Sequence, residues 1–261
     1  MKGARHVDID HNSFKRAIAK GQLQIGLWSS LVSNISTDIL SDAGYDWIVV
    51  DMEHAANEIG TVLAQLQALN GGSATPMVRP PGHDPVIVKR ILDIGAQTLL
   101  FPMVDTAEQA ELAVAATRYP PKGIRGVSLS QRGNRYGRVG NYTDVVQDEL
   151  CIIVQIETRK GMTNLEKIAA VDGVDGVFFG PADLSASIGL IGQLSHEKVH
   201  EVLLEGLERC REAGKPAGIL TGIEADAKKF IDAGYTFVAV GADQGLLAKE
   251  SVALRRRFKP D

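Results

Sequence analysis

The sequence predicts an α/β protein of the (β/α)8 barrel class, also called a TIM barrel, and three observations support this. Several helical segments end in a glycine that is followed by a short apolar run. Counted with the other apolar runs, these give about eight strands, the number that such a barrel requires. The length of 261 residues also matches a barrel of about 250 residues built as one unit. We therefore expect a single domain over residues 1–261.

The expected strands are continuously apolar instead of alternating, which is typical of parallel strands that are buried on both faces. In chain order they are Gln24–Trp28, Trp47–Val50, Thr75–Arg79, Thr98–Phe101, Cys151–Glu157, Gly176–Phe179, Ala217–Leu220 and Phe237–Val240. Before five of these strands a glycine stands where a helix should end, a position that favours the left-handed conformation. These glycines are Gly44, Gly95, Gly173, Gly214 and Gly234.

Apolar residues at helical spacing predict helices between the strands. They are Glu58–Asn70, Asp84–Asp93, Thr106–Ala116, Ser195–Glu212 and Glu224–Ala233. A doubly wound open sheet is the alternative arrangement, but no Gly-x-Gly-x-x-Gly motif follows the first strand. The repetition of helix, glycine and buried strand therefore favours the barrel.

Two segments break this rhythm. Residues 119–148 are rich in Gly, Arg, Pro and Asn and show no clear periodicity, so we expect a long loop that is functional or mobile. Residues 244–258 have a helical pattern and follow the last strand. This helix would either complete the barrel or reach a neighbouring subunit.

Composition and charge exclude several classes of function. The net charge of −4 and the pI of about 5.9 give no basic footprint for nucleic acid. We expect no membrane association, because no apolar stretch could span a bilayer and the N-terminus lacks the core of a signal peptide. Cys151 lies in an apolar strand and Cys210 in a charged helix, which predicts reduced thiols in a cytoplasmic protein.

Two carboxylates stand just past apolar runs, Glu157 after the fifth expected strand and Asp183 after the sixth. The carboxyl ends of parallel strands form the mouth of an α/β fold, where active sites are built. Two acids at neighbouring strand ends suit a hard divalent cation. The alternative is that each acid only caps the helix that follows it.

Other strands also end in polar residues. His54 follows the second strand near Asp51, and a neighbouring carboxylate can prepare an imidazole for acid–base catalysis. Arg79 ends the third strand, where it could bind a carboxylate or stabilise an enolate. Gln155 shares one side of its strand with Glu157 and could donate into the mouth. The alternatives are a hydrogen-bonded loop histidine, a structural ion pair and a side chain that fills the barrel.

Lysine is absent from the interior and carboxyl ends of the expected strands. Schiff-base aldol chemistry needs a desolvated lysine in the pocket. The sequence therefore argues against that chemistry.

Taken together, these motifs resemble the HpcH/HpaI family of metal-dependent pyruvate aldolases. The resemblance covers nearly the whole chain, and the set of motifs in this order is specific although each short motif alone is not. The motifs are Gly26-Leu27-Trp28, Asp51-Met52-Glu53-His54, Val78-Arg79, Arg118-Tyr119-Pro120-Pro121-Lys122-Gly123-Ile124-Arg125-Gly126, Gln155-Ile156-Glu157 and Gly180-Pro181-Ala182-Asp183-Leu184-Ser185.

The resemblance implies reversible aldol cleavage of a 4-hydroxy-2-oxo acid to pyruvate and an aldehyde, in the catabolism of aromatic compounds or sugar acids. It implies a homohexamer, a dimer of trimers, in which neighbours exchange the last helix. Glu157 and Asp183 match the ligands of a divalent metal ion. The two-carboxylate set suits Mg²⁺ or Mn²⁺, with Co²⁺ or Zn²⁺ as substitutes.

The resemblance also implies roles for individual side chains. His54, paired with Asp51, matches the acid–base group, and Arg79 matches the arginine beside the keto oxygen. Gln155 matches a residue near the metal and pyruvate. The remaining matches are to substrate contacts: the backbone of Gly180, Pro181, Ala182 and Asp183 at the pyruvate carboxylate, and Trp28 and Leu220 on the aldehyde side.

Two other functions stay open. An acyl-CoA lyase of the citrate lyase type uses a similar barrel and acid pair, although no obvious basic site for nucleotide phosphates is present. A non-catalytic barrel that binds a metabolite is the second. The arginines within residues 119–148 could steer an anionic aldehyde, contact another subunit or be solvated; they are Arg125, Arg132, Arg135 and Arg138.

Overall fold

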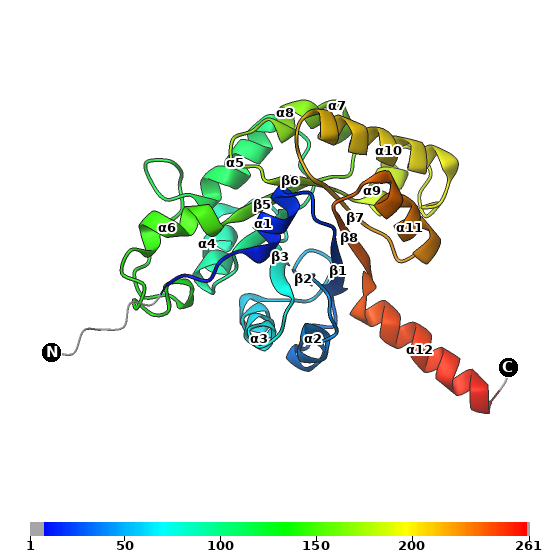
Figure 1. Ribbon diagram of the computed structural model, residues 1–261, viewed down its shortest axis with the longest axis horizontal. Coiled ribbons are helices and arrows are strands. Elements are labelled where there is room, and N and C mark those ends of the chain that lie inside the picture. The colour runs from blue at the N-terminus through cyan, green and yellow to red at the C-terminus, as the bar shows by residue number, and fades with distance from the viewer. Residues whose placement is uncertain (1–7, 260–261) are drawn as a thin grey trace.

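A computed structural model describes residues 8–259 and confirms the (β/α)8 barrel. Eight parallel strands pair in chain order, and β8 closes onto β1 (Figure 1). The strands are β1 (Gln24–Ser29), β2 (Trp47–Asp51), β3 (Thr75–Arg79), β4 (Thr98–Phe101), β5 (Cys151–Ile156), β6 (Gly176–Phe179), β7 (Ala217–Leu220) and β8 (Phe237–Ala242).

The five helices expected between the strands are present as α3 (Ile59–Leu69), α4 (Pro85–Asp93), α5 (Ala107–Thr117), α10 (Glu197–Glu212) and α11 (Glu224–Ala233). Their ends lie within two residues of the expected ones. Further helices are short, and most are too brief to show a periodic pattern. They are α1 (Ser13–Ala19), α2 (Asn34–Ser41), α7 (Arg159–Thr163), α8 (Leu165–Ala169) and α9 (Pro181–Ser187).

The expectation of an unstructured segment over residues 119–148 is partly wrong. This segment contains the 3-10 turn η1 (Arg132–Asn134) and the helix α6 (Tyr142–Glu149). The helix buries Tyr142, Val146 and Glu149. Its periodicity was hidden because a helix of 8 residues repeats its apolar face only about twice.

The glycines before the strands behave as expected. All five have positive φ, from 68° at Gly214 to 110° at Gly234. Gly234 is the left-handed C-cap of α11. A side chain at this position would be strained, so glycine lets the chain leave the helix and enter β8 directly.

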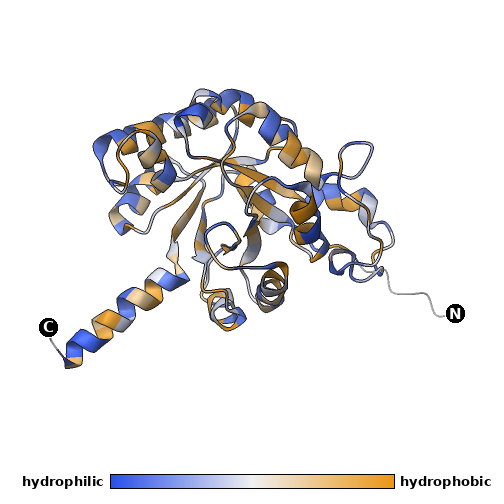
Figure 2. Cartoon of the chain, turned by 180° about the vertical axis from the view of Figure 1, so that it is seen from behind, coloured by the Kyte–Doolittle hydropathy of each residue, from blue (hydrophilic) through white to orange (hydrophobic). Residues whose placement is uncertain are grey.

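The barrel has two apolar cores. One lies between the strands and the surrounding helices, and the other fills the barrel interior with Trp28, Trp47, Phe178, Phe237 and their neighbours. In Figure 2 the central strands are coloured as hydrophobic, as this double burial requires. Both cysteines, Cys151 and Cys210, are buried and free. No helix within residues 8–259 is long and apolar enough to cross a membrane.

Small residues make room for the interior aromatic rings. A Cβ atom at Gly26 would lie 2.2 Å from the Trp47 ring, and one at Gly218 would lie 2.1 Å from the Phe237 ring. Phe14 of α1 packs against both rings, with centroids 5.7 and 5.5 Å away. The helix α1 therefore closes the amino-terminal end of the barrel, which we call the barrel floor.

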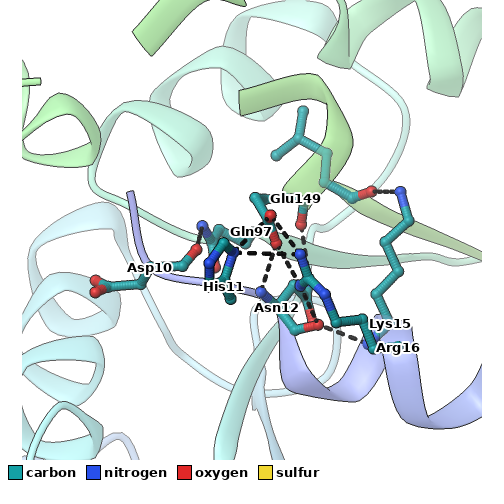
Figure 3. A network of polar contacts seen from close by, with 8 residues as sticks. Asp10, His11, Asn12, Lys15, Arg16, Gln97 and Glu149 are labelled. Atoms are coloured by element: carbon teal, nitrogen blue, oxygen red, sulfur yellow. Dashed lines mark hydrogen bonds and ion pairs between the residues drawn. The ribbon is translucent and has the colours of Figure 1, made fainter. Parts of the chain in front are cut away.

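The chain before α1 is held by a polar cluster around Glu149 (Figure 3). The Glu149 carboxylate accepts hydrogen bonds from Asn12 N at 2.7 Å and from both terminal nitrogens of Arg16 at 2.7 and 2.6 Å. The Asn12 amide donates to the Glu149 carbonyl and to Thr98 Oγ1, both at 2.9 Å. These bonds join α1 to the starts of β4 and β5.

The last helix, α12 (Asp243–Phe258), projects away from the barrel (Figure 1). Every residue from 244 to 259 is exposed, whereas Asp243 is buried. The Asp243 carboxylate accepts hydrogen bonds from Ser30 N at 2.8 Å and Leu31 N at 3.2 Å, which ties the base of α12 to the end of β1. The helix does not complete the barrel wall.

Glu149→Gln should lower the free energy of unfolding at pH 7 by about 2 kcal/mol, because it removes the charge of a buried acceptor that binds the buried Asn12 N and the half-exposed Arg16. The hydrogen bonds from Arg16 lower the pKa of Glu149 to about 2. This stabilisation is therefore present above the ordinary pKa of 4.5 and is lost as the pH falls toward 2. Urea unfolding at pH 7 and pH 3 should show the difference between wild type and variant narrowing at the lower pH.

Glu166→Gln is the matched control. The hydrogen bonds from Arg209 also lower the pKa of Glu166 to about 2, but 56% of the Glu166 side chain is exposed. We expect its substitution to cost well under about 1 kcal/mol. Equal losses in the two variants would show that burial of Glu149 contributes nothing.

Candidate active site

The mouth of the barrel is lined by side chains at inward-facing positions of the strands. Because side chains alternate along a strand, Asp51 follows Trp47 and Val49 on the inner side, and both of those are interior core residues. Arg79 also faces inward, because it lies two residues after the interior residue Met77 on β3. The sheet register makes Asp51 and Arg79 direct Cα partners on β2 and β3.

Arg79 and Asp51 form a buried bidentate ion pair. Arg79 Nε donates to Asp51 Oδ1 at 2.8 Å, and Arg79 Nη2 donates to Oδ2 at 2.7 Å. The two side chains are 8% and 2% exposed. Both carboxylate oxygens of Asp51 therefore bind Arg79, and the pairing of Asp51 with His54 stays a prediction.

Glu53 is a member of the site that the sequence reasoning did not single out. Its Oε2 lies 2.9 Å from Arg79 Nη1 and 3.9 Å from His54 Nε2, and its side chain is 15% exposed. His54 lies at the rim, with 65% of its side chain exposed. The sequence offered one signal for Glu53, its position two residues after Asp51.

Glu157 is buried at the end of β5, with 2% of its surface exposed. Gln155 Nε2 donates to its Oε2 at 2.5 Å, and Met103 N donates to its Oε1 at 2.8 Å. Glu157 does not cap a helix, because the N-cap of α7 is Thr158. The Met103 amide was not predicted, since nothing in the local sequence shows that the loop after β4 reaches β5.

Asp183 lies in the first turn of α9, whose N-cap is Gly180 and whose first residue is Pro181. Ala182 and Asp183 are exposed, so the Asp183 carboxylate is accessible from solvent. Asp183 is therefore not the N-cap that the alternative interpretation required. Gly180 lies directly against the neighbouring strand, where a Cβ atom would be 2.3 Å from Glu157 Oε2.

The carboxylates of the mouth perturb one another. Burial, followed by the negative charges of Glu53 and Asp183, raises the pKa of Glu157 to about 7. Burial is also the main cause that raises the pKa of Glu53, against the lowering effect of Arg79. Burial opposes ionisation of Arg79, but Asp51, Glu53 and Glu157 together keep the pKa of its guanidinium raised.

This donor set fits a hard divalent cation. Glu157 and Asp183 offer carboxylate oxygens, and Gln155 Oε1 is a buried carbonyl oxygen with no hydrogen-bond partner among the described residues. Within residues 8–259 no group of three or more His, Cys, Asp or Glu side chains is arranged to hold a metal ion. A cation here would therefore complete its coordination with Gln155, water or substrate.

An apolar wall stands beside these charges. The Trp28 ring lies 5.4 Å from the Arg79 guanidinium carbon, and its own Nε1 is buried without a hydrogen-bond partner in the described structure. Leu220 ends β7 and packs half-buried against the same interior cluster. The site thus combines charged groups with an aromatic and an aliphatic surface.

The family model described as "HpcH/HpaI aldolase/citrate lyase" matches residues 24–249. The chain belongs to this family. It is 49% identical over 252 residues to 5-keto-4-deoxy-D-glucarate aldolase of Escherichia coli K12, which covers 97% of this chain and 98% of that protein. At this identity to named aldolases over the full chain, the protein is an aldolase, a carbon–carbon lyase that acts on small molecules.

Solved structures agree with this assignment. An HpcH/HpaI aldolase/citrate lyase family protein from Burkholderia cenocepacia J2315 is 37% identical, with a TM-score of 0.92 over 95% of this chain and 99% of that one. An HpcH/HpaI aldolase from Desulfitobacterium hafniense DCB-2 is 29% identical, with a TM-score of 0.86 over 95% and 96% of the two chains.

Gly180→Ala should reduce aldolase activity at least tenfold while the fold persists, which corresponds to about 1.4 kcal/mol at the transition state. The added Cβ would lie 2.3 Å from Glu157 Oε2 and 2.8 Å from Gln155 Nε2, so both side chains must move. Steady-state kinetics and circular dichroism measure the two effects.

Gly222→Ala is the matched control, because it lies at the end of β7 and a Cβ atom there would meet nothing within 4 Å. We expect this variant to retain activity near that of the wild type. Wild-type kinetics in Gly180→Ala would show that contact between Gly180 and Glu157 does not matter to the reaction.

Proposed function

We propose that this aldolase uses a divalent metal ion to cleave a 4-hydroxy-2-oxo acid reversibly into pyruvate and an aldehyde. The single observation that carries the proposal is the group of carboxylates at the mouth, where burial first, and then the charges of Glu53 and Asp183, raise the pKa of Glu157 to about 7. A cation would relieve their mutual repulsion. Mg²⁺ or Mn²⁺ suits this oxygen-rich set best, and Co²⁺ or Zn²⁺ could replace them.

The substrate class follows from chemistry and from the named relatives. Counted from its keto end, 5-keto-4-deoxy-D-glucarate, the substrate named for the relatives, is itself a 4-hydroxy-2-oxo acid. We therefore infer a sugar-acid substrate in preference to one derived from an aromatic compound. Cleavage of such a substrate gives pyruvate and an aldehyde that still carries a carboxylate.

Glu157, Asp183 and Gln155 are the residues that would hold the cation. The chemistry that such a cation supplies when bound is Lewis-acid polarisation of the keto group. Gln155 and the Met103 amide fix the Glu157 carboxylate through hydrogen bonds to its two oxygens. The backbone of Gly180, Pro181, Ala182 and Asp183 would lie against the substrate carboxylate.

Arg79 supplies a permanent positive charge at the keto oxygen. Two of its five N–H groups donate to Asp51, and Nη1 forms an ion pair with Glu53 Oε2 at 2.9 Å. Both terminal nitrogens therefore keep N–H groups for the substrate. Negative charge that develops on the keto oxygen during carbon–carbon cleavage would be stabilised there. Asp51 acts by orienting Arg79.

His54 would exchange a proton with the C4 hydroxyl. It lies at the rim and is largely exposed, with Glu53 near its Nε2, so a water molecule can relay the proton. Trp28 and Leu220 would form the wall on the aldehyde side. Because the aldehyde leaves from the exposed end, the histidine is placed where solvent and product meet.

The projecting helix α12 supports a subunit contact. Its apolar residues Leu246, Leu247, Val252, Leu254 and Phe258 are exposed, and such a surface favours an interface. We propose a homohexamer, a dimer of trimers, in which neighbouring subunits exchange this helix within a cytoplasmic enzyme. Sedimentation velocity would contradict the proposal if the protein were monomeric.

Metal-stripped protein should release pyruvate from 5-keto-4-deoxy-D-glucarate only after Mg²⁺ or Mn²⁺ is added. Glu157→Gln and Asp183→Asn should each lose about 10²–10³-fold in kcat, a magnitude typical of a lost charge-stabilising group.

The Glu157 pKa of about 7 means that metal binding competes with a proton below neutral pH. Affinity should therefore fall with decreasing pH, with proton release measurable by calorimetry.

The unstripped wild type is the control for this series. Pyruvate release at an unchanged rate after stripping would exclude the metal mechanism. If neither this substrate nor 4-hydroxy-2-oxoheptanedioate is cleaved but an acyl-CoA thioester is, the citrate lyase type becomes the better assignment. No turnover of any of them would favour a barrel that only binds a metabolite.

His54→Ala should slow cleavage by about 10²–10⁴-fold, the usual contribution of a positioned acid–base group. Exchange of the pyruvate methyl protons with D₂O should be affected far less, because His54 acts at the C4 oxygen. Proton NMR follows the exchange, and a pyruvate assay follows the cleavage. Equal losses in both reactions would instead place His54 at the methyl group.

A further inference from the structure

The arginines of residues 119–148 do not face the mouth of the barrel. Arg132 Nη1 donates to Ile94 O at 2.6 Å, directly after α4 and before β4 begins. Arg135 donates to Asp10 Oδ1 at 2.5 Å, in the chain that leads into α1. Both contacts lie at the barrel floor, so these side chains cannot steer an aldehyde toward the mouth of their own barrel.

A cavity of about 610 Å³ opens at this floor. It lies between the chain before α1, the starts of β3 and β4, and residues 132–142. Volumes of several hundred Å³ are typical of sites for small molecules. The cavity is separated from the mouth by the interior aromatic core, and no residue of the proposed catalytic site lines it.

Positive charge prevails in the cavity wall. Arg132, Arg135 and Arg138 line it, and Asp10 is the acidic residue in the same wall. In Figure 3 the Asp10 side chain points away from the Glu149 cluster, and 79% of it is exposed. A local excess of positive charge on a chain of net charge −4 indicates a place where an anion can bind.

The three arginines differ in how they are held. Arg132 is half-buried, and burial together with the charge of Arg135 lowers its pKa. Arg135 pairs with the exposed carboxylate of Asp10. The Arg138 side chain makes no hydrogen bond or ion pair within the described part of the chain, and its backbone N donates to Arg135 O at 3.3 Å. These guanidinium groups therefore retain N–H donors that an oxyanion could accept.

The loop that carries them is fixed by the fold. Asn134 is buried and its side chain accepts a hydrogen bond from Gly137 N at 2.8 Å. Arg135 and Tyr136 are consecutive residues with φ of 54° and 58°. Non-glycine residues rarely adopt this conformation, and such strain is found where a loop must present particular side chains.

A buried ion pair lies behind the loop. Arg125 is fully buried, donates to Asp93 Oδ1 at 3.0 Å and lies 4.5 Å from the Tyr119 ring centroid. Its Nε and Nη1 have no partner among the described residues.

We propose that the floor cavity binds a small polyanion with at least two negative charges, held by Arg132, Arg135 and Arg138. Phosphate and carboxylate groups present the same oxygen acceptors to a guanidinium. Inorganic pyrophosphate and citrate are therefore the two probes, and the tighter one identifies the ligand class. The proposal is independent of the metal site, so the measurement uses metal-free protein.

Isothermal titration of metal-free wild-type protein at constant ionic strength should show saturable binding of one probe. The double variant Arg135→Gln/Arg138→Gln should bind it at least tenfold more weakly, because two charge-assisted contacts are lost. Arg90→Gln is the matched control, since Arg90 is an exposed arginine of α4 outside the cavity, and it should bind as the wild type does. Circular dichroism verifies that each variant is folded.

Three results would overturn the proposal. The first is that neither probe binds at millimolar concentration. The second is that the double variant binds the probe as tightly as the wild type does, and the third is that Arg90→Gln weakens binding as much as the double variant. Sedimentation velocity on the same samples tests whether the arginines instead contact another subunit. If the double variant loses oligomeric state while wild type binds neither anion, the arginines contact another subunit and no anion site exists.

Discussion

The buried ion pair between Arg79 and Asp51 is the constraint on which the site depends. It joins direct register partners on β2 and β3 and uses both oxygens of the carboxylate. Removing one partner would leave an uncompensated charge inside the barrel, which commonly costs about 3–5 kcal/mol. A shift of either strand by one residue would turn its side chain out of the mouth. Register, burial and the position of Arg79 therefore depend on each other.

The mouth holds more negative charge than Arg79 can balance. Asp51, Glu53, Glu157 and Asp183 act on one another, and burial together with these charges raises the pKa of Glu157 and Glu53. Carboxylates brought together in this way are expensive for a folded chain and are typical of a functional site. Packing of the apolar interior and of the floor helix α1 stabilises the fold and so offsets the cost of these clustered carboxylates.

The two ends of the barrel differ in character. The mouth is acidic and lies at the carboxyl ends of the strands, whereas the floor cavity is lined by arginines and lies where the strands begin. The packed interior of Trp28, Trp47, Phe178 and Phe237 separates them. Ligands at the two ends would therefore bind without contact between them, and any influence of one on the other would have to pass through the strands or the surrounding helices.

Much of the fold was predictable because its signals are local. Continuous apolar runs marked all eight strands, and the five glycines with positive φ marked helix ends. The positions of Glu157 and Gln155 followed from strand ends and alternation. The contact of Asp51 with Arg79, the position of Glu53 and the Met103 amide were not predicted. Those contacts join different strands and loops, and no local pattern contains them.

The sequence by itself determined the barrel class, the strand positions and the family. These depend on hydrophobic periodicity, helix endings and short motifs, which are properties of neighbouring residues. Only the tertiary structure decided that Asp51 holds Arg79, that Glu53 lies beside both Arg79 and His54, and that the arginines of residues 119–148 lie at the floor. These follow from strand register and loop paths, which bring together residues far apart in the chain, and packing of the whole barrel fixes them.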